Sequence, residues 1–104
     1  MKKLQEHIKK INKERGWDET TVSELFMYLS EEVGEAAKAA RQIMNSRVDK
    51  NSDKYELGHE LADILSYVLD IANRFDVDLE KSYWEKEEIN KTRNWTKNDD
   101  KDLV

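Results

Sequence analysis

Five carboxylates at helical spacing could do chemistry in this sequence. Glu31, Glu32 and Glu35 fall in the segment LSEEVGE, and Glu60 and Asp63 fall in the segment HELAD. Residues three positions apart are neighbours on one face of a helix, so Glu32 with Glu35, and Glu60 with Asp63, form two pairs of adjacent acids. Carboxylates that are brought together repel one another, and a hard divalent cation offsets that repulsion through oxygen ligands. The two pairs form one site only if the helices that carry them lie side by side.

The composition restricts any metal site to oxygen ligands. The chain of 104 residues has no Cys and two His, which excludes thiolate zinc sites, thiol nucleophiles and disulfides. Mg²⁺ is the usual ion for carboxylate ligands when a phosphate is also present. The excess of 23 acidic over 18 basic residues argues against a nucleic-acid polymer as partner. Because we find neither an apolar run of about 20 residues nor a signal-peptide core, we expect a cytoplasmic protein without a membrane partner.

Periodic apolar residues predict four helices, over residues 1–15, 21–44, 53–75 and 79–93, with short polar connectors between them. The absence of Pro and the presence of only three Gly also favour helix. The apolar face of the second helix is centred on Leu29, and that of the third on Leu61. We also expect Trp84 to belong to the core face of the last helix.

Local signals mark where these helices begin and end. Gly16 is a plausible residue to end the first helix. The sequence T-x-x-E from Thr21 to Glu24 predicts a capping box at the start of the second. Asp53, with an acid three places on, predicts a similar cap for the third, and Asp76 or Asp78 could cap the last.

These elements predict an all-α fold, an antiparallel four-helix arrangement with two long central helices that the first and last helices cover. A single domain is expected over residues 1–95, with a frayed tail at 96–104. Because so short a chain can hardly cover both long helices, we expect it to assemble as a helical-bundle dimer or tetramer.

The orientation of the acids relative to the apolar faces favours a common site. With about 100° per residue, Glu32 borders the apolar stripe and Glu35 lies further round on the same side, whereas Glu31 points nearly opposite. On the third helix Glu60 flanks the stripe and Asp63 lies further round. Antiparallel packing can therefore bring the two pairs together beside the core, although acidic pairs on helices are often only solvated.

The ordered motifs resemble those of the MazG-like, all-α nucleoside triphosphate pyrophosphohydrolases. The segments LSEEVGE and ELADIL match the signature E-E-x-x-E … E-x-x-D of that family. The segment RGWD precedes the first motif, DVDLE follows the second, and Lys86, Asn90 and Arg93 form a K-x-x-x-N-x-x-R ending. The resemblance extends over roughly residues 15–95.

The resemblance implies an activity and a ligand set. The expected reaction is the Mg²⁺-dependent hydrolysis of an NTP or dNTP between the α and β phosphates, which yields the nucleoside monophosphate and pyrophosphate. Mg²⁺, with Mn²⁺ as an alternative ion, would be held by Glu32, Glu35, Glu60 and Asp63. A carboxylate that is not fully used as a ligand, Glu31 or Glu35, could accept the proton of the attacking water.

The resemblance also implies how the substrate is held. Lys86, Asn90 and Arg93 lie on one face of the last helix and would bind phosphates, and Trp17 could stack on the base. The nucleotide would lie near a subunit boundary of a homodimer or homotetramer.

Two alternatives remain open from the sequence. One is an enzyme like phosphoribosyl-ATP pyrophosphohydrolase, which shares a helical fold and a similar acidic motif. The other is a non-catalytic helical dimerisation module whose carboxylates are solvated.

Overall fold

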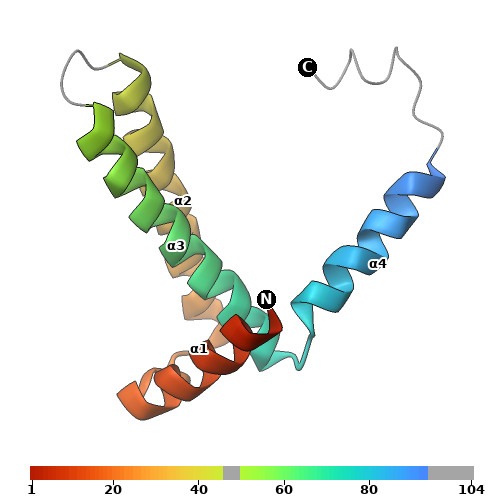
Figure 1. Ribbon diagram of the computed structural model, residues 1–104. Coiled ribbons are helices and arrows are strands. Elements are labelled where there is room, and N and C mark those ends of the chain that lie inside the picture. The colour runs from red at the N-terminus through yellow and green to blue at the C-terminus, as the bar shows by residue number, and fades with distance from the viewer. Residues whose placement is uncertain (46–49, 94–104) are drawn as a thin grey trace.

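The computed structural model describes residues 1–45 and 50–93, and within these ranges it is helical with no strand. The helices are α1 (Lys2–Arg15), α2 (Val22–Asn45), α3 (Lys50–Arg74) and α4 (Leu79–Thr92), and a short 3₁₀ turn, η1 (Trp17–Glu19), joins α1 to α2 (Figure 1). The all-α class with two long central helices is therefore confirmed. The tail predicted from residue 96 lies outside the described residues.

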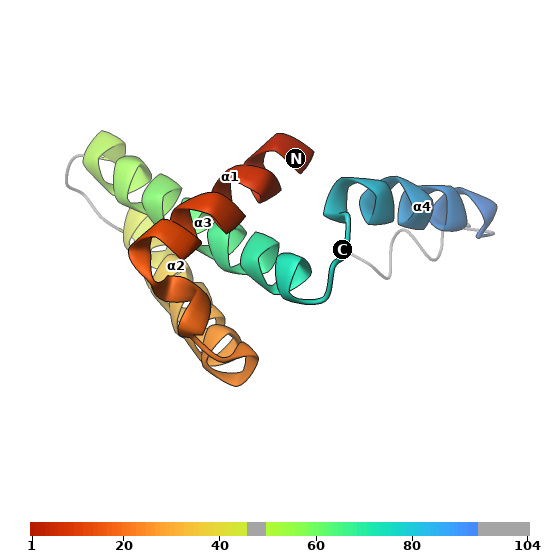
Figure 2. The ribbon, with the colours of Figure 1, turned by 90° about the horizontal axis from the view of Figure 1, so that it is seen from below.

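The core lies where α1 crosses the antiparallel pair formed by α2 and α3 (Figures 1 and 2). It is built from small and branched apolar side chains, which let the helices approach closely. The buried apolar residues are Ile8 on α1, Leu25, Ala36 and Ala39 on α2, and Leu69 and Ala72 on α3. Among the described helices, none combines the length and the apolar character that crossing a membrane requires.

Most of the predicted helix ends are confirmed. Gly16 follows α1 with a left-handed φ of 75°. Thr21 and Glu24 form the reciprocal capping box, in which the Glu24 amide donates to Thr21 Oγ1 at 3.1 Å and the Thr21 amide donates to Glu24 Oε1 at 3.3 Å. Asp78 caps α4 by accepting a hydrogen bond from the Lys81 amide at 3.2 Å.

The predicted start of the third helix is wrong. The helix begins at Lys50, so position 53 lies within the helix and does not begin it. An acid is also favourable inside the first turn, because the N-terminal end of a helix carries partial positive charge. An acid in the sequence is therefore expected both at the cap position and in the first turn of a helix, and the sequence alone does not distinguish the two.

The predicted centre of the third helix's apolar face is also wrong. Leu61 is 53% exposed, whereas Leu69, two turns later, is fully buried at 0%. α1 packs against α3, and its contacts with Asn73 and Val77 lie near the C-terminal end of that helix. Among the described residues, Leu61 consequently stays half-exposed.

The last helix does not cover the bundle as predicted. α4 diverges from α2 and α3 after a sharp corner (Figures 1 and 2). Trp84, expected in the core, is 61% exposed. The physical reason lies in the corner itself, where the buried Gln5 side chain of α1 donates to the Val77 carbonyl at 2.9 Å and accepts from the Leu79 amide at 2.9 Å. These bonds fix the direction in which α4 leaves.

Candidate active site

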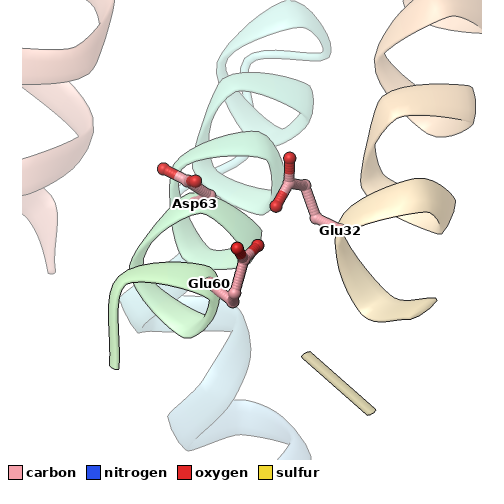
Figure 3. A group of neighbouring side chains, drawn as sticks. All are labelled: Glu32, Glu60 and Asp63. Carbon is pink, nitrogen blue, oxygen red and sulfur yellow. The ribbon is translucent and has the colours of Figure 1, made fainter. Parts of the chain in front are cut away.

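Three of the predicted carboxylates meet between the two long helices. Glu32 comes from α2, and Glu60 and Asp63 come from neighbouring turns of α3 (Figure 3). One carboxylate oxygen from each residue lies within 4.8 Å of the others. Glu32 and Glu60 are partly buried and Asp63 is exposed, so the group opens toward solvent on the side of Asp63. The three-residue spacing on α3 and the antiparallel packing of α2 produce the arrangement that the sequence suggested.

Two oxygens of this group are buried without a compensating donor. Among the described residues, nothing donates a hydrogen bond to Glu32 Oε2 or to Glu60 Oε2. A buried carboxylate without a donor or a cation is costly, because its charge loses solvation by water. The three residues therefore offer hard carboxylate oxygens whose negative charge needs to be offset. A divalent ion such as Mg²⁺ supplies the positive charge.

The electrostatics of the group agree with this need for a cation. The pKa of Glu32 is raised from 4.5 to about 7, first by a hydrogen bond with Glu60, next by burial, and then by repulsion from Glu35, Glu60 and Asp63. Burial and nearby negative charges both disfavour the ionised form of a carboxyl group. The surrounding carboxylates thus favour a proton or a metal ion at Glu32.

The other two predicted acids of α2 lie at the edge of this group. Glu35 is exposed and falls outside the three clustered carboxylates, although it is near enough to raise the pKa of Glu32. Glu35 and Glu60 line a pocket of about 490 Å³ together with Lys38 and His59. Glu31 is also exposed. The pKa of Tyr67 is raised mainly by burial and next by Glu32, Asp63 and Tyr28, and Glu31 makes the smallest of these contributions.

Asp63 also lines a second, larger pocket. It has a volume of about 570 Å³ and lies among α1, η1, α2 and α3. Its lining includes the aromatic residues Trp17, Tyr28 and Tyr67, and the polar residues His7 and Asn12. Tyr28 and Tyr67 also pack against each other, with ring centroids 6.1 Å apart. An aromatic wall with a few polar groups is typical of a small-molecule site.

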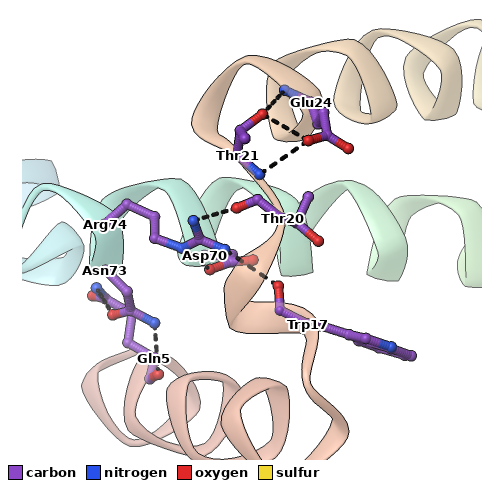
Figure 4. Close-up of polar contacts among 8 residues, drawn as sticks. All are labelled: Gln5, Trp17, Thr20, Thr21, Glu24, Asp70, Asn73 and Arg74. Carbon is purple, nitrogen blue, oxygen red and sulfur yellow. Dashed lines mark hydrogen bonds and ion pairs between the residues drawn. The ribbon is translucent and has the colours of Figure 1, made fainter.

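Trp17 lines this pocket from a turn that α3 holds in place. Its side chain is half-exposed, and the guanidinium of Arg15 lies 4.9 Å from the ring centroid. Arg74 of α3 donates to the main-chain carbonyls of Trp17 and Thr20 (Figure 4). The same guanidinium pairs with the buried carboxylate of Asp70 at 3.3 Å. The pair therefore connects the pocket wall to α3.

The predicted phosphate-binding residues are not brought to the carboxylates within one chain. Lys86, Asn90 and Arg93 belong to α4 and to its C-terminal end, which diverge from the α2–α3 pair (Figure 1). Neither of the two pockets is lined by a residue of α4.

Sequence reasoning missed several residues around the site. Lys38 contributes a cation beside Glu35, and Asp70 with Arg74 fixes the Trp17 turn. Asp70 lies seven residues after Asp63 and therefore on the same face of α3, and Arg74 follows it at i+4, so helical spacing could have indicated this pair. His7, which had no obvious partner in the sequence, lies in the wall of the larger pocket.

Replacing Arg74 by Ala is expected to destabilise the fold by about 2–4 kcal/mol, because it leaves Asp70 buried and unpaired. Burial raises the pKa of Asp70 and Arg74 opposes that rise. In the variant the pKa rises further, so the loss of stability should be larger at pH 8, where the lone carboxyl must ionise, than at pH 5. Urea unfolding at the two pH values measures this difference.

The exposed Arg41 of α2 provides a matched control for this experiment. Arg41→Ala should change the free energy of unfolding by less than about 0.5 kcal/mol at either pH, since surface substitutions have small effects. Equal effects of the two substitutions would show that the Asp70–Arg74 pair contributes nothing specific.

Comparison with known proteins shows the family of the chain. A family model described as the MazG nucleotide pyrophosphohydrolase domain matches residues 20–94, which include all three clustered carboxylates and α4. Searches among curated proteins and among solved structures found no match. The matched residues make up most of the 104-residue chain. The chain therefore belongs to the MazG nucleotide pyrophosphohydrolase domain family.

Proposed function

We propose that the protein hydrolyses a nucleoside triphosphate, an NTP or a dNTP, between its α and β phosphates with Mg²⁺. The observation that carries this proposal is the group formed by Glu32, Glu60 and Asp63, in which two oxygens are buried without a donor. The membership of the chain in a family of nucleotide pyrophosphohydrolases makes a phosphorylated nucleotide the natural substrate class.

Glu32, Glu60 and Asp63 would hold the metal ion, and Glu35 could join them through a change of rotamer because it is exposed at the edge of the group. Mn²⁺ accepts the same oxygen ligands and could replace Mg²⁺. When bound, the ion would offset charge on the phosphate oxygens and lower the pKa of a nearby water.

Glu35 is the best-placed carboxylate to accept a proton in this reaction. Water attacks phosphorus, the bond to the pyrophosphate oxygen breaks, and the proton of the water passes to a carboxylate. Glu35 lies beside the clustered acids and is exposed, so it can face both the water and solvent. Glu31, four residues earlier on α2, is the alternative acceptor.

The larger pocket would take the nucleoside. Asp63 lines this pocket together with Trp17 and Tyr67, so a base could lie against either ring with its phosphates toward the carboxylates. In a homodimer or homotetramer, Lys86, Asn90 and Arg93 of a second subunit would contact the phosphates, because α4 diverges from the carboxylates of its own chain (Figure 1). A nucleotide substrate also suits the cytoplasmic location predicted from the sequence.

Purified protein with Mg²⁺ is expected to release pyrophosphate from at least one member of a panel of common and modified NTPs and dNTPs. Excess EDTA should abolish the release, and added Mg²⁺ should restore it. The panel should include phosphoribosyl-ATP, because its exclusive cleavage would identify the alternative enzyme. Absence of pyrophosphate from every member, together with no Mg²⁺-dependent rise in Tm, would favour a non-catalytic helical module.

A further inference from the structure

The larger pocket contains a buried carboxylate that the proposed reaction does not use. Asp70 lines this pocket and is only 7% exposed, and the buried apolar side chains of Ile8 and Leu25 line the same pocket. A charged group in such surroundings is costly unless other groups compensate it. Asp70 lies seven residues after Asp63, which is about 10 Å along the helix axis, so it does not belong to the clustered metal ligands.

Arg74 occupies only one oxygen of this carboxylate. Its Nε donates to Asp70 Oδ1 at 3.3 Å (Figure 4), whereas a carboxylate can accept about four hydrogen bonds. Among the described residues we find no donor to Oδ2, and this oxygen is not enclosed as Oε2 of Glu32 and of Glu60 are. Burial raises the pKa of Asp70, and Arg74 opposes that rise and so favours the ionised form. An ionised acceptor is therefore available to a ligand of the pocket.

The position of this acceptor suits the base of a nucleotide. Asp63, Tyr67 and Asp70 follow one another at spacings of four and three, so they lie in one row on α3, and all three line the pocket. The distance of about 10 Å along this row is similar to the length of a nucleoside from its 5′ phosphate to the far edge of its base. Arg74 bonds to both Asp70 and the main chain of Trp17, so one guanidinium holds both the acceptor and the turn that carries an aromatic ring.

A carboxylate distinguishes bases by the groups on their edges, because it accepts hydrogen bonds and cannot donate them. Cytosine and adenine present an amino group where uracil, thymine and hypoxanthine present a carbonyl oxygen. An amino group would donate to Oδ2 of Asp70. A carbonyl oxygen would be repelled and would leave Oδ2 without a partner, which costs more between apolar walls than in water.

The other polar side chains of the pocket discriminate less between these two edges. His7 and Asn12 can each present either a donor or an acceptor, as can the hydroxyl groups of the lining. Arg15 can only donate, but it is exposed and its guanidinium lies 4.9 Å from the centroid of the Trp17 ring. Apart from the metal ligand, Asp70 is thus the residue of the lining that can only accept.

We infer that Asp70 is a specificity-determining residue, whose Oδ2 accepts a hydrogen bond from the exocyclic amino group of the base. The site then takes cytosine or adenine nucleotides in preference to nucleotides that present a carbonyl at the same position. This inference rests on the proposed function, because it requires that the larger pocket holds the nucleoside of the substrate.

Two matched pairs of substrates test the inference on the unmodified protein. The members of each pair, dCTP with dUTP and dATP with dITP, differ in whether the base presents an amino group or a carbonyl. We expect kcat/KM for pyrophosphate release with Mg²⁺ to favour the amino member at least about tenfold in each pair that is hydrolysed, because the bond involves a charged acceptor. Equal values within the pairs, or a preference for the carbonyl member, would overturn the inference.

Asp70→Asn tests whether this residue is the source of the preference. The amide oxygen of the variant can still accept from Arg74, while the amide nitrogen presents a donor to the base. The preference for the amino member should therefore fall at least about tenfold or reverse. A purely structural role would lower kcat/KM for both members by the same factor, and that result would contradict the inference. If the variant does not fold, as judged by its Tm, the substrate pairs on the wild type decide.

Asp76→Asn is the matched control for this substitution. Asp76 is exposed in the turn after α3, lines neither of the two pockets, and has a left-handed φ of 56°, which Asn adopts readily. This variant loses the same charge only six residues away from Asp70, and it should keep the wild-type preference within both pairs.

A failure of the proposed function can be told apart from a failure of this inference. If the wild type releases pyrophosphate from no nucleotide, the proposed function fails, and calorimetric binding of dCMP, dUMP, dAMP and dIMP then decides on Asp70. Tighter binding of the amino members by the wild type, lost in Asp70→Asn, would support the inference. Equal binding within the pairs, or no binding of any of the four, would overturn it.

Discussion

Replacing Glu60 by Gln should lower Mg²⁺-dependent pyrophosphate release at least about 100-fold, because it removes a charged ligand from a group with three carboxylates. The substitution keeps the size and shape of the side chain, so the packing of α3 against α2 should remain. The loss would then reflect the charge at this one position. Activity measured over a range of Mg²⁺ concentrations would separate weaker metal binding from slower hydrolysis.

The same substitution should have the opposite effect on the metal-free protein. Glu60 is the first cause of the raised pKa of Glu32, and its Oε2 is buried without a donor. Removing its charge relieves repulsion, so in EDTA at pH 8 the Tm of Glu60→Gln should be equal to or higher than that of the wild type. Added Mg²⁺ should raise the Tm of the wild type and leave that of the variant nearly unchanged.

Glu56 provides the matched control, since it is an exposed glutamate one turn before Glu60 on α3. Glu56→Gln should retain both activity and the Mg²⁺-dependent rise in Tm. A Glu60→Gln protein that hydrolyses its substrate at the wild-type rate would refute the metal site, whatever the stability data show.

The features that could be predicted from the sequence are those that depend on neighbours along one helix. The capping box of Thr21 and Glu24, and the left-handed Gly16 after α1, are decided within four residues. The i, i+3 spacing of Glu60 and Asp63 is similarly local. Glu32 lies beside the apolar stripe of its helix. Once the two long helices pack together, its meeting with Glu60 and Asp63 could therefore be predicted as well.

The features that could not be predicted depend on contacts between distant segments. The direction of α4 is fixed by the side chain of Gln5, more than seventy residues earlier, which accepts from Leu79. The exposure of Leu61 and the burial of Leu69 depend on where α1 crosses α3. Apolar periodicity marks a face of a helix as suited to burial, but it cannot say whether the cover comes from the same chain or from another.

The affinity for Mg²⁺ should depend strongly on pH, because a proton competes with the ion at Glu32. The pKa of this group is raised to about 7, so most molecules carry the proton at pH 6 and few carry it at pH 8. The ligand must lose that proton before it binds the ion, and the apparent affinity should therefore be about tenfold weaker at pH 6 than at pH 8. Titration of Mg²⁺ by calorimetry at the two pH values measures the ratio directly.

The stability of the metal-free protein should depend on Glu32 in the opposite direction: it should fall as the pH rises, whereas the affinity for Mg²⁺ increases. A carboxyl whose pKa is raised on folding contributes stability that is present below its unfolded value of 4.5 and is lost as the pH rises through about 7. The metal-free protein should therefore lose stability over this range, and saturating Mg²⁺ should reduce the loss because the ion replaces the proton. In Glu60→Gln the pKa of Glu32 should fall toward its ordinary value, and this part of the pH dependence should disappear. Equal Mg²⁺ affinity at pH 6 and pH 8 would mean that Glu32 is not a ligand. The ligands of the ion would then be Glu35, Glu60 and Asp63.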